Sequence, residues 1–186
     1  GAAHNRVAFG GLTMVWMALL TILRQGSAEG KANACGALSK LGFRNTNNVL
    51  RMMKHPGMLT ALTALLDEDI NELRVVVQAW RVLQNCCSGM EEVKVMLCAD
   101  VTVLARLGSA CHSSADEVRM RAVSVLMHSS ASAEAKVDLL RARIPETALQ
   151  AVMSSETEDL ATRIRATLAS ANLIGREERS ILSTAR

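Results

Sequence analysis

Proline and aromatic residues are scarce in this sequence. Its 186 residues contain two Pro, two Phe, two Trp and no Tyr. So few prolines favour helices, because proline breaks a helix interior. The net charge of +3 is too small for the dense basic surface of a nonspecific nucleic-acid binder. The hydrophobic content of 49% excludes a disordered chain, so we expect a folded domain with no nucleic-acid partner.

Sequence motifs of catalysis and metal binding are also missing. There is no G-x-x-x-x-G-K, G-x-G-x-x-G, H-E-x-x-H or G-x-S-x-G. Cys111 and His112 are neighbours, but consecutive helical side chains point about 100° apart and do not face each other. We therefore predict a protein that is not an enzyme, with no metal and no cofactor. For the weaker alternative of a reactive pocket, the candidates are His128 and Arg121.

The five cysteines form no C-x-x-C pair; they are Cys35, Cys86, Cys87, Cys98 and Cys111. An odd number without the tight spacing of a secreted scaffold indicates reduced thiols that fill the core. This predicts an intracellular, reducing compartment. The organelle stays open, because the chain begins without Met and a removed targeting segment is compatible with it.

An internal repeat is present. Four segments pair a small residue with a residue four positions later: Ala34 to Leu38, Ala79 to Leu83, Ala122 to Leu126, and Ala166 to Ser170. Their last positions are 45, 43 and 44 residues apart. Pro56 and Pro145 are 89 residues apart, which is two periods, and proline favours helix starts. Capping boxes at 69–72, 114–117 and 155–158 have the same phase. The period therefore describes one structural unit.

Each period predicts a short, a middle and a long helix, because apolar residues recur at helical spacing. The short helices are expected at 47–54, 91–98 and 133–141, the middle ones at 58–66, 101–111 and 145–153, and the long ones at 28–42, 71–87, 116–129 and 158–173. Such triplets bury their apolar faces only by stacking. We expect an all-α, right-handed α-solenoid of about four repeats in a single domain, 1–186. Its parts are an incomplete first repeat (1–45), repeats at 46–88, 89–130 and 131–174, and the start of a further repeat or a tail (175–186).

The sequence resembles the armadillo repeat family, and more distantly HEAT repeats. The likeness lies in His55-Pro-Gly-Met-Leu59, Leu62-Thr-Ala-Leu-Leu66 and Ala79-Trp-Arg-Val-Leu-Gln-Asn85, and its pattern covers about residues 10–186. The resemblance implies that the long helices line a concave surface. Nuclear-transport members carry Trp two residues before the pattern Leu, where this chain has Gly36, Arg81, Ser124 and Leu168. We therefore do not expect recognition of nuclear signals.

One face of the long helices predicts a binding surface. The last pattern residue of each repeat is Leu38, Leu83, Leu126 or Ser170, and positions −5, −2 and +2 from it share one side of a helix. The −2 positions are Gly36, Arg81, Ser124 and Leu168, and the −5 and +2 positions are Asn33, Lys40, Gln78, Asn85, Arg121, His128, Arg165 and Asn172. We call these residues the ladder, and none of them is acidic. Amides pair with a peptide backbone and Arg holds carboxylates, so we expect an acidic, extended partner segment. The alternative is a solvated face without a partner.

Residues 7–23 form a stretch of 17 residues without a charge, between Arg6 and Arg24. Its length reaches the lower limit for crossing a bilayer, which leaves membrane contact as an alternative. The positions of Leu19 and Leu23 favour a middle helix instead. We expect no short helix upstream of it, so Met14, Trp16 and Met17 would be exposed. A partner chain, a missing N-terminal part or a lipid surface would then cover them.

Two functions follow from these features. The favoured one is a noncatalytic protein–protein interaction module that binds a partner along the polar and basic ladder of its long helices. The alternative is a permanent structural or scaffolding subunit of a large multiprotein complex, held through its apolar N-terminal helix and repeat edges. A membrane-associated complex is included in this alternative. Both take other protein chains as partners.

Overall fold

The computed structural model describes residues 2–144 and 148–174. In these ranges the chain forms twelve α-helices and no strand, so the all-α fold class is confirmed. The helices are α1 (Ala2–Gly10), α2 (Thr13–Gln25), α3 (Ala28–Gly42), α4 (Thr46–Lys54), α5 (Met58–Ala64), α6 (Leu73–Cys87), α7 (Glu91–Ala99), α8 (Val101–Ala110), α9 (Asp116–Ser130), α10 (Ala133–Arg141), α11 (Gln150–Ser154) and α12 (Leu160–Leu173). Pro145 and residues 175–186 lie outside the described residues.

The chain divides into two compact units, and the division falls inside α7. Unit 1 is Gly1–Val93 and unit 2 is Lys94–Arg186. The predicted single domain, with its repeat boundaries, stays a prediction. Each unit contains one pair of long helices, which are α3 and α6 in unit 1 and α9 and α12 in unit 2.

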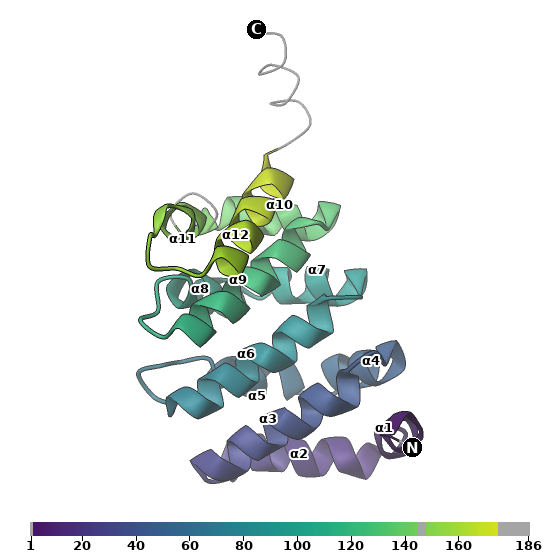
Figure 1. Cartoon of the computed structure of the whole chain (residues 1–186). Coiled ribbons are helices and arrows are strands. Elements are labelled where there is room, and N and C mark those ends of the chain that lie inside the picture. The colour runs from purple at the N-terminus through teal and green to yellow at the C-terminus, as the bar shows by residue number, and fades with distance from the viewer. Residues whose placement is uncertain (1, 145–147, 175–186) are drawn as a thin grey trace, which may run out of the picture. The chain divides into compact units, whose positions relative to one another are not determined.

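Unit 1 stacks two helix triplets. The long helices α3 and α6 lie side by side (Figure 1), and the middle helices α2 and α5 contact each other. The pattern residues Leu38 and Leu83 are completely buried, as expected for the core face of a long helix. Burial of such side chains stabilises a fold by about 1.5–3 kcal/mol each. The repeat period therefore marks the packing faces correctly in this unit.

The expectation that no short helix lies upstream of the first middle helix is wrong. Helix α1 is a short helix that contacts α2, α3 and α4. The structure shows why the sequence concealed it. The uncharged stretch 7–23 is not one helix, because α1 ends at Gly10 and the chain turns by 85° before α2.

The end of α1 is held by side chains from α2 and α4. The indole N–H of Trp16 donates to the Gly10 carbonyl at 3.1 Å. The Asn48 amide Nδ2 donates to the carbonyls of Arg6, at 2.8 Å, and Leu41, at 2.9 Å. A Cβ at Gly10 would lie 2.0 Å from Asn48 Oδ1, so this approach requires glycine. These contacts satisfy carbonyls that a helix end leaves unpaired.

No described helix is long and apolar enough by itself to cross a bilayer. Residues Ala3–Gly10 and Thr13–Gln25 meet that requirement only as a pair, judged by length and composition, with the 85° bend between them.

Unit 2 repeats the arrangement around α9 and α12, which lie side by side (Figure 1). Helices α8 and α10 pack on α9, and α11 packs on α12. An ion pair joins the two long-helix segments, since Arg119 Nε is 2.7 Å from Glu158 Oε2. The exposed fractions of these side chains are 16% and 3%, so this pair is largely withdrawn from water.

The predicted capping boxes are wrong in detail. Helices α6 and α9 begin after Glu72 and Ala115, and neither residue caps its helix with a side chain. Helix α12 is capped by Asp159, whose Oδ1 accepts from the Thr162 N–H at 3.1 Å. One of the expected capping groups, the Glu158 carboxylate, instead binds Arg119.

Helix α5 also begins later than the proline suggested. Pro56 lies in the turn before it, and the N-cap is Gly57, whose φ of 78° is left-handed. Only glycine adopts this conformation without strain.

Candidate protein-binding surface

The ladder residues of unit 1 lie on two neighbouring helices. Asn33 and Lys40 are exposed on α3, and Arg81 is exposed on α6, while Gln78 and Asn85 are half-buried. The Asn85 amide Nδ2 donates to Ser39 Oγ at 2.7 Å, across the contact between α3 and α6. This hydrogen bond fixes the orientation of the Asn85 amide.

The ladder residues of unit 2 are less accessible. Arg121 and His128 on α9, and Arg165 and Asn172 on α12, are all half-buried. The Asn172 amide Nδ2 donates to Ser130 Oγ at 3.2 Å. Each unit therefore has a similar joint, in which an Asn two positions after the last pattern residue donates to a Ser near the end of the preceding long helix.

Two ladder positions of unit 2 differ from the sequence expectation. Arg121 Nη2 forms an ion pair with Glu117 Oε1, one turn earlier on α9, so its charge is already compensated. Ser124 is buried and donates to the Met120 carbonyl at 2.7 Å. The accessible basic character of α9 is therefore smaller than its sequence suggests.

His128 lies in a cationic environment. Its pKa is lowered from the ordinary value of 6.5, first by burial and then by the positive charges of Lys94 and Arg165. The imidazole is therefore neutral at pH 7, when it offers one donor and one acceptor. Arg121 lies seven residues before His128, about 10 Å away along the helix axis, and forms an ion pair with Glu117. These positions do not form a catalytic pair.

The sequence analysis missed two lysines on this surface. Lys94 lies near His128, as the pKa effect shows, and Lys136 Nζ donates to the Asn172 carbonyl at 2.7 Å. Both are the fourth residue of a short helix, α7 and α10 respectively. A comparison of the short helices in repeat register could therefore have found them.

The chemistry of the cysteines is that of core residues. All five are buried and free. Burial raises the pKa of Cys35 and Cys111 to about 12 and that of Cys98 to about 11. Such thiols stay protonated and unreactive at neutral pH. The described residues contain no group of three His, Cys, Asp or Glu side chains placed to hold a metal ion.

A separate groove of about 540 Å³ lies along α8 in unit 2. Leu104, Gly108, His112 and Arg143 are among its lining residues, and none of the ladder residues is. The ladder residues of unit 2 therefore lie outside this groove.

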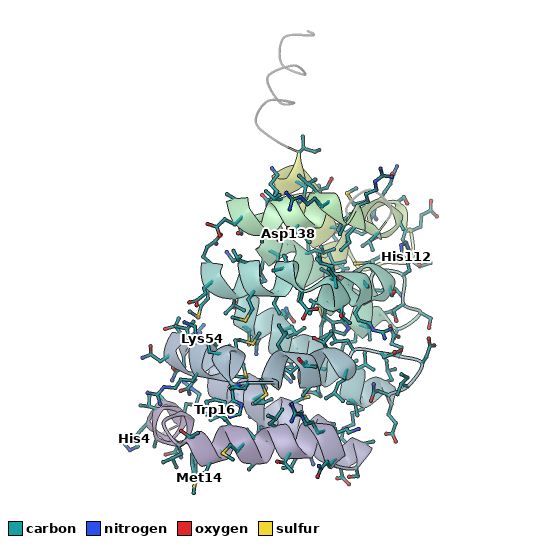
Figure 2. The ribbon with its side chains drawn as sticks, turned by 180° about the vertical axis from the view of Figure 1, so that it is seen from behind. His4, Met14, Trp16, Lys54, His112 and Asp138 are labelled. Atoms are coloured by element: carbon teal, nitrogen blue, oxygen red, sulfur yellow. The ribbon has the colours of Figure 1, made fainter. Side chains whose placement is uncertain are left out.

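The N-terminal end presents a second candidate surface. Met14 and Met17 are 70% and 58% exposed, as expected, and Val7 and Phe9 of the preceding helix α1 are also exposed. The expectation for Trp16 is wrong, because this side chain is 3% exposed and its indole N–H donates a hydrogen bond to the Gly10 carbonyl. In Figure 2 Met14 projects away from α2, whereas Trp16 lies on the inner side.

No protein-family model matches the chain, and no curated protein matches it in sequence. Solved structures match its fold. An engineered protein has a TM-score of 0.76 and 22% identity, over 87% of this chain and 63% of its own. The designed armadillo repeat protein YIII(Dq)4CqI has a TM-score of 0.73 and 24% identity, over 83% of this chain and 63% of its own.

A computationally designed armadillo repeat protein for modular peptide recognition matches equally well. Its TM-score is 0.73 at 24% identity, over 83% of this chain and 62% of its own. The chain thus has an armadillo-like repeat fold, an all-α solenoid. It spans about three fifths of the length of these solved structures.

Proposed function

We propose that this protein is a protein-binding module whose ladder residues bind an acidic, extended segment of a partner chain. The observation that carries the proposal is the joint shared by both units. In each, an accessible Asn amide is oriented by a Ser of the neighbouring helix, and cationic side chains lie on the same helices. A designed protein of the same fold was made for modular peptide recognition, which adds support.

The amides suit a peptide backbone. An extended peptide leaves its own N–H and C=O groups unpaired, and an Asn side chain supplies both a donor and an acceptor. An amide that is already oriented loses less conformational entropy on binding. Asn85 and Asn172 meet this condition because one N–H of each is bonded to a Ser hydroxyl.

The cations select the charge of the partner. Lys40 and Arg81 are exposed in unit 1, and in unit 2 Lys94 and Arg165 both act on the pKa of His128. No ladder residue is acidic. Complementary charge increases the association rate and rejects basic segments.

The test uses extended peptides that differ only in charge. We expect the full-length chain to bind an Asp/Glu-rich peptide in fluorescence anisotropy, and to bind a Lys-rich peptide of the same length much more weakly. Arg81→Glu and Arg165→Glu should each weaken binding of the acidic peptide by roughly tenfold, which is typical for the loss of an Arg in an interface.

Arg141→Glu is the matched control, because this α10 side chain is 77% exposed and is not in the ladder. It should change binding little. Equal binding of acidic and Lys-rich peptides, or an equal loss in Arg141→Glu, would contradict the proposal.

The exposed N-terminal end favours a second function, that of a structural subunit held by its apolar surface. Met14, Met17, Val7 and Phe9 are all more than half exposed. Terminal repeats normally need a polar outer surface for solubility. A permanent neighbour that covers these side chains would satisfy that requirement.

Solution behaviour separates the two functions. A structural subunit should self-associate when purified alone, and Met14→Gln with Met17→Gln should restore the monomer in size-exclusion chromatography. Ile70→Gln, at a 78% exposed loop residue, is the control and should not restore it. A monomeric wild-type chain would favour the binding module.

A further inference from the structure

Helix α12 has a second apolar face that nothing in the described structure covers. Its buried residues are Thr162, Ala166, Ala169 and Leu173. On nearly the opposite side lies a row that we call the α12 stripe, consisting of Leu160, Ile164, Leu168 and Ile174. These side chains are 70%, 50%, 50% and 41% exposed. Leu160, Ile164 and Leu168 recur every four residues, which places them on one side of the helix, and Ile174 follows directly after its last residue.

The repeat register shows what this side of a long helix does. Ser130 of α9, which contacts Asn172 of α12, lies four residues after the last pattern residue, and Ile174 has the same position in α12. Ser124 of α9 corresponds to Leu168 in the same way. Ser130 and Ser124 are 2% and 1% exposed, and Ser130 accepts a hydrogen bond from Asn172 of the next long helix, α12. The Ser130 position of α9 thus faces the next long helix, whereas the corresponding residue of the α12 stripe, Ile174, is 41% exposed.

The charges around the stripe define the chemistry of that helix. Arg163 lies on one side of the stripe and Arg165 on the other, by helical geometry, and both are half-buried. Helix α12 contains no acidic residue, and neither arginine forms an ion pair with a described residue. An apolar row between two cations fits a helix with an apolar row between acidic side chains.

We propose that the α12 stripe is a docking site for an amphipathic helix of a partner protein, with acidic residues flanking its apolar row. This site overlaps the proposed ladder at Leu168 and Arg165, but apolar contact and not backbone recognition carries it. Burial of three or four large side chains supplies the attraction, and Arg163 and Arg165 select the charge.

A second copy of the chain fits the site less well. Its exposed helix α2 would offer Met14 and Met17 as apolar contacts. However, residues 1–28 contain no Asp or Glu, so such a contact would supply no counter-charge to either arginine. The partner helix should instead place its acids opposite the middle of α12, away from Asp159 at its start.

The experiment uses two helical peptides of 14 residues, the length of α12, each with a Leu row at positions i, i+4 and i+8. One carries Glu on both sides of the row and the other carries Lys. We expect the full-length chain to bind the Glu peptide, in fluorescence anisotropy, roughly tenfold more tightly than the Lys peptide. Ile164→Glu should reduce binding of the Glu peptide by roughly tenfold or more.

Two variants give the proposal its sharpest test. The double variant Arg163→Glu with Arg165→Glu should reverse the preference and bind the Lys peptide more tightly. Ile70→Glu, at an exposed apolar residue of unit 1, should leave binding unchanged. Circular dichroism should show native helix content in both, since none of the three side chains is buried.

The ladder proposal fails or succeeds separately. Arg81→Glu, a ladder variant in unit 1, should leave binding of the helical Glu peptide unchanged. Ile164→Glu should leave binding of the extended acidic peptide unchanged. Failure of both helical peptides to bind the full-length chain, equal binding of the two, or an unreversed preference in the double variant would overturn the docking site.

Discussion

Units 1 and 2 stack the same kind of long-helix pair but hold their helices together with different chemistry. Unit 1 uses neutral groups, such as the Asn48 amide that bonds to Arg6 and Leu41. Its ion pair between Lys54 and Glu92 is half-exposed and contributes little. Unit 2 instead holds α9 and the start of α12 through the largely buried pair of Arg119 and Glu158. The two units thus hold helix contacts with different chemistry, and we expect them to differ in their sensitivity to mutation.

The largest expected effect is the loss of Arg119 in unit 2. Besides Glu158, its guanidinium binds the Ser113 carbonyl at 2.6 Å and Asp116 at 2.5 Å. Arg119→Ala leaves the Glu158 carboxylate buried without its partner, which should destabilise unit 2 by about 3–5 kcal/mol. Urea titration with pulsed alkylation of the buried Cys98 and Cys111 measures this in unit 2.

The control for this prediction is Arg141→Ala, which removes an exposed arginine and should cost less than about 0.5 kcal/mol. Replacing both partners, in Arg119→Met with Glu158→Leu, should recover most of the lost stability. A cost for Arg119→Ala no greater than that for Arg141→Ala would show that unit 2 does not depend on its ion pair.

The second effect concerns the neutral contacts of unit 1. Gly10→Ala would place a Cβ 2.0 Å from Asn48 Oδ1, which displaces the amide from its two carbonyl partners. We expect a cost of about 1–3 kcal/mol, read from alkylation of the buried Cys35. Gly36→Ala is the control, because nothing lies within 4 Å of its Cβ. It should stabilise α3 by up to about 1 kcal/mol, so a loss there equal to that at Gly10 would be against the prediction.

The positions of the long helices and their packing faces could be predicted from the sequence, because the period of the pattern residues marks the buried side of each helix. The range predicted for the first long helix, 28–42, agrees with α3 residue by residue. Helix α1 was missed because Gly10 and Gly11 are both uncharged and small, so apolar patterning alone gives no signal for an 85° turn.

The side-chain partners of the candidate site were harder to predict. Arg119 and Glu158 are 39 residues apart, and their contact depends on the stacking of α9 and α12. The ladder residues were placed on long helices correctly, but Arg121 pairs with Glu117 and Ser124 is buried. Helical spacing predicts which side of a helix a residue occupies, and tertiary packing decides whether that side meets water or another helix.

The third effect tests what the two units share. Asn85→Ala removes the donor to Ser39, and Asn172→Ala removes the donor to Ser130. Each change leaves a buried hydroxyl with one partner fewer, so each should cost its own unit about 1 kcal/mol. Alkylation of Cys35 reports unit 1 and that of Cys111 reports unit 2. A cost in one unit and none in the other would show that the two joints are not equivalent.

The smallest effect is a pH dependence in unit 2. Burial, Lys94 and Arg165 lower the pKa of His128 below 6.5, so the unfolded chain binds this proton more readily than the folded chain. The stability that depends on neutral His128 is therefore fully present above pH 6.5 and is lost as the pH falls below it. Because His128 is only half-buried, we expect a loss below about 1 kcal/mol between pH 7.5 and 5.5. His128→Gln removes the titration, so the difference between variant and wild type in urea melts followed by circular dichroism should change over this range. A difference that stays constant with pH would mean that the cations around His128 do not affect the stability of unit 2.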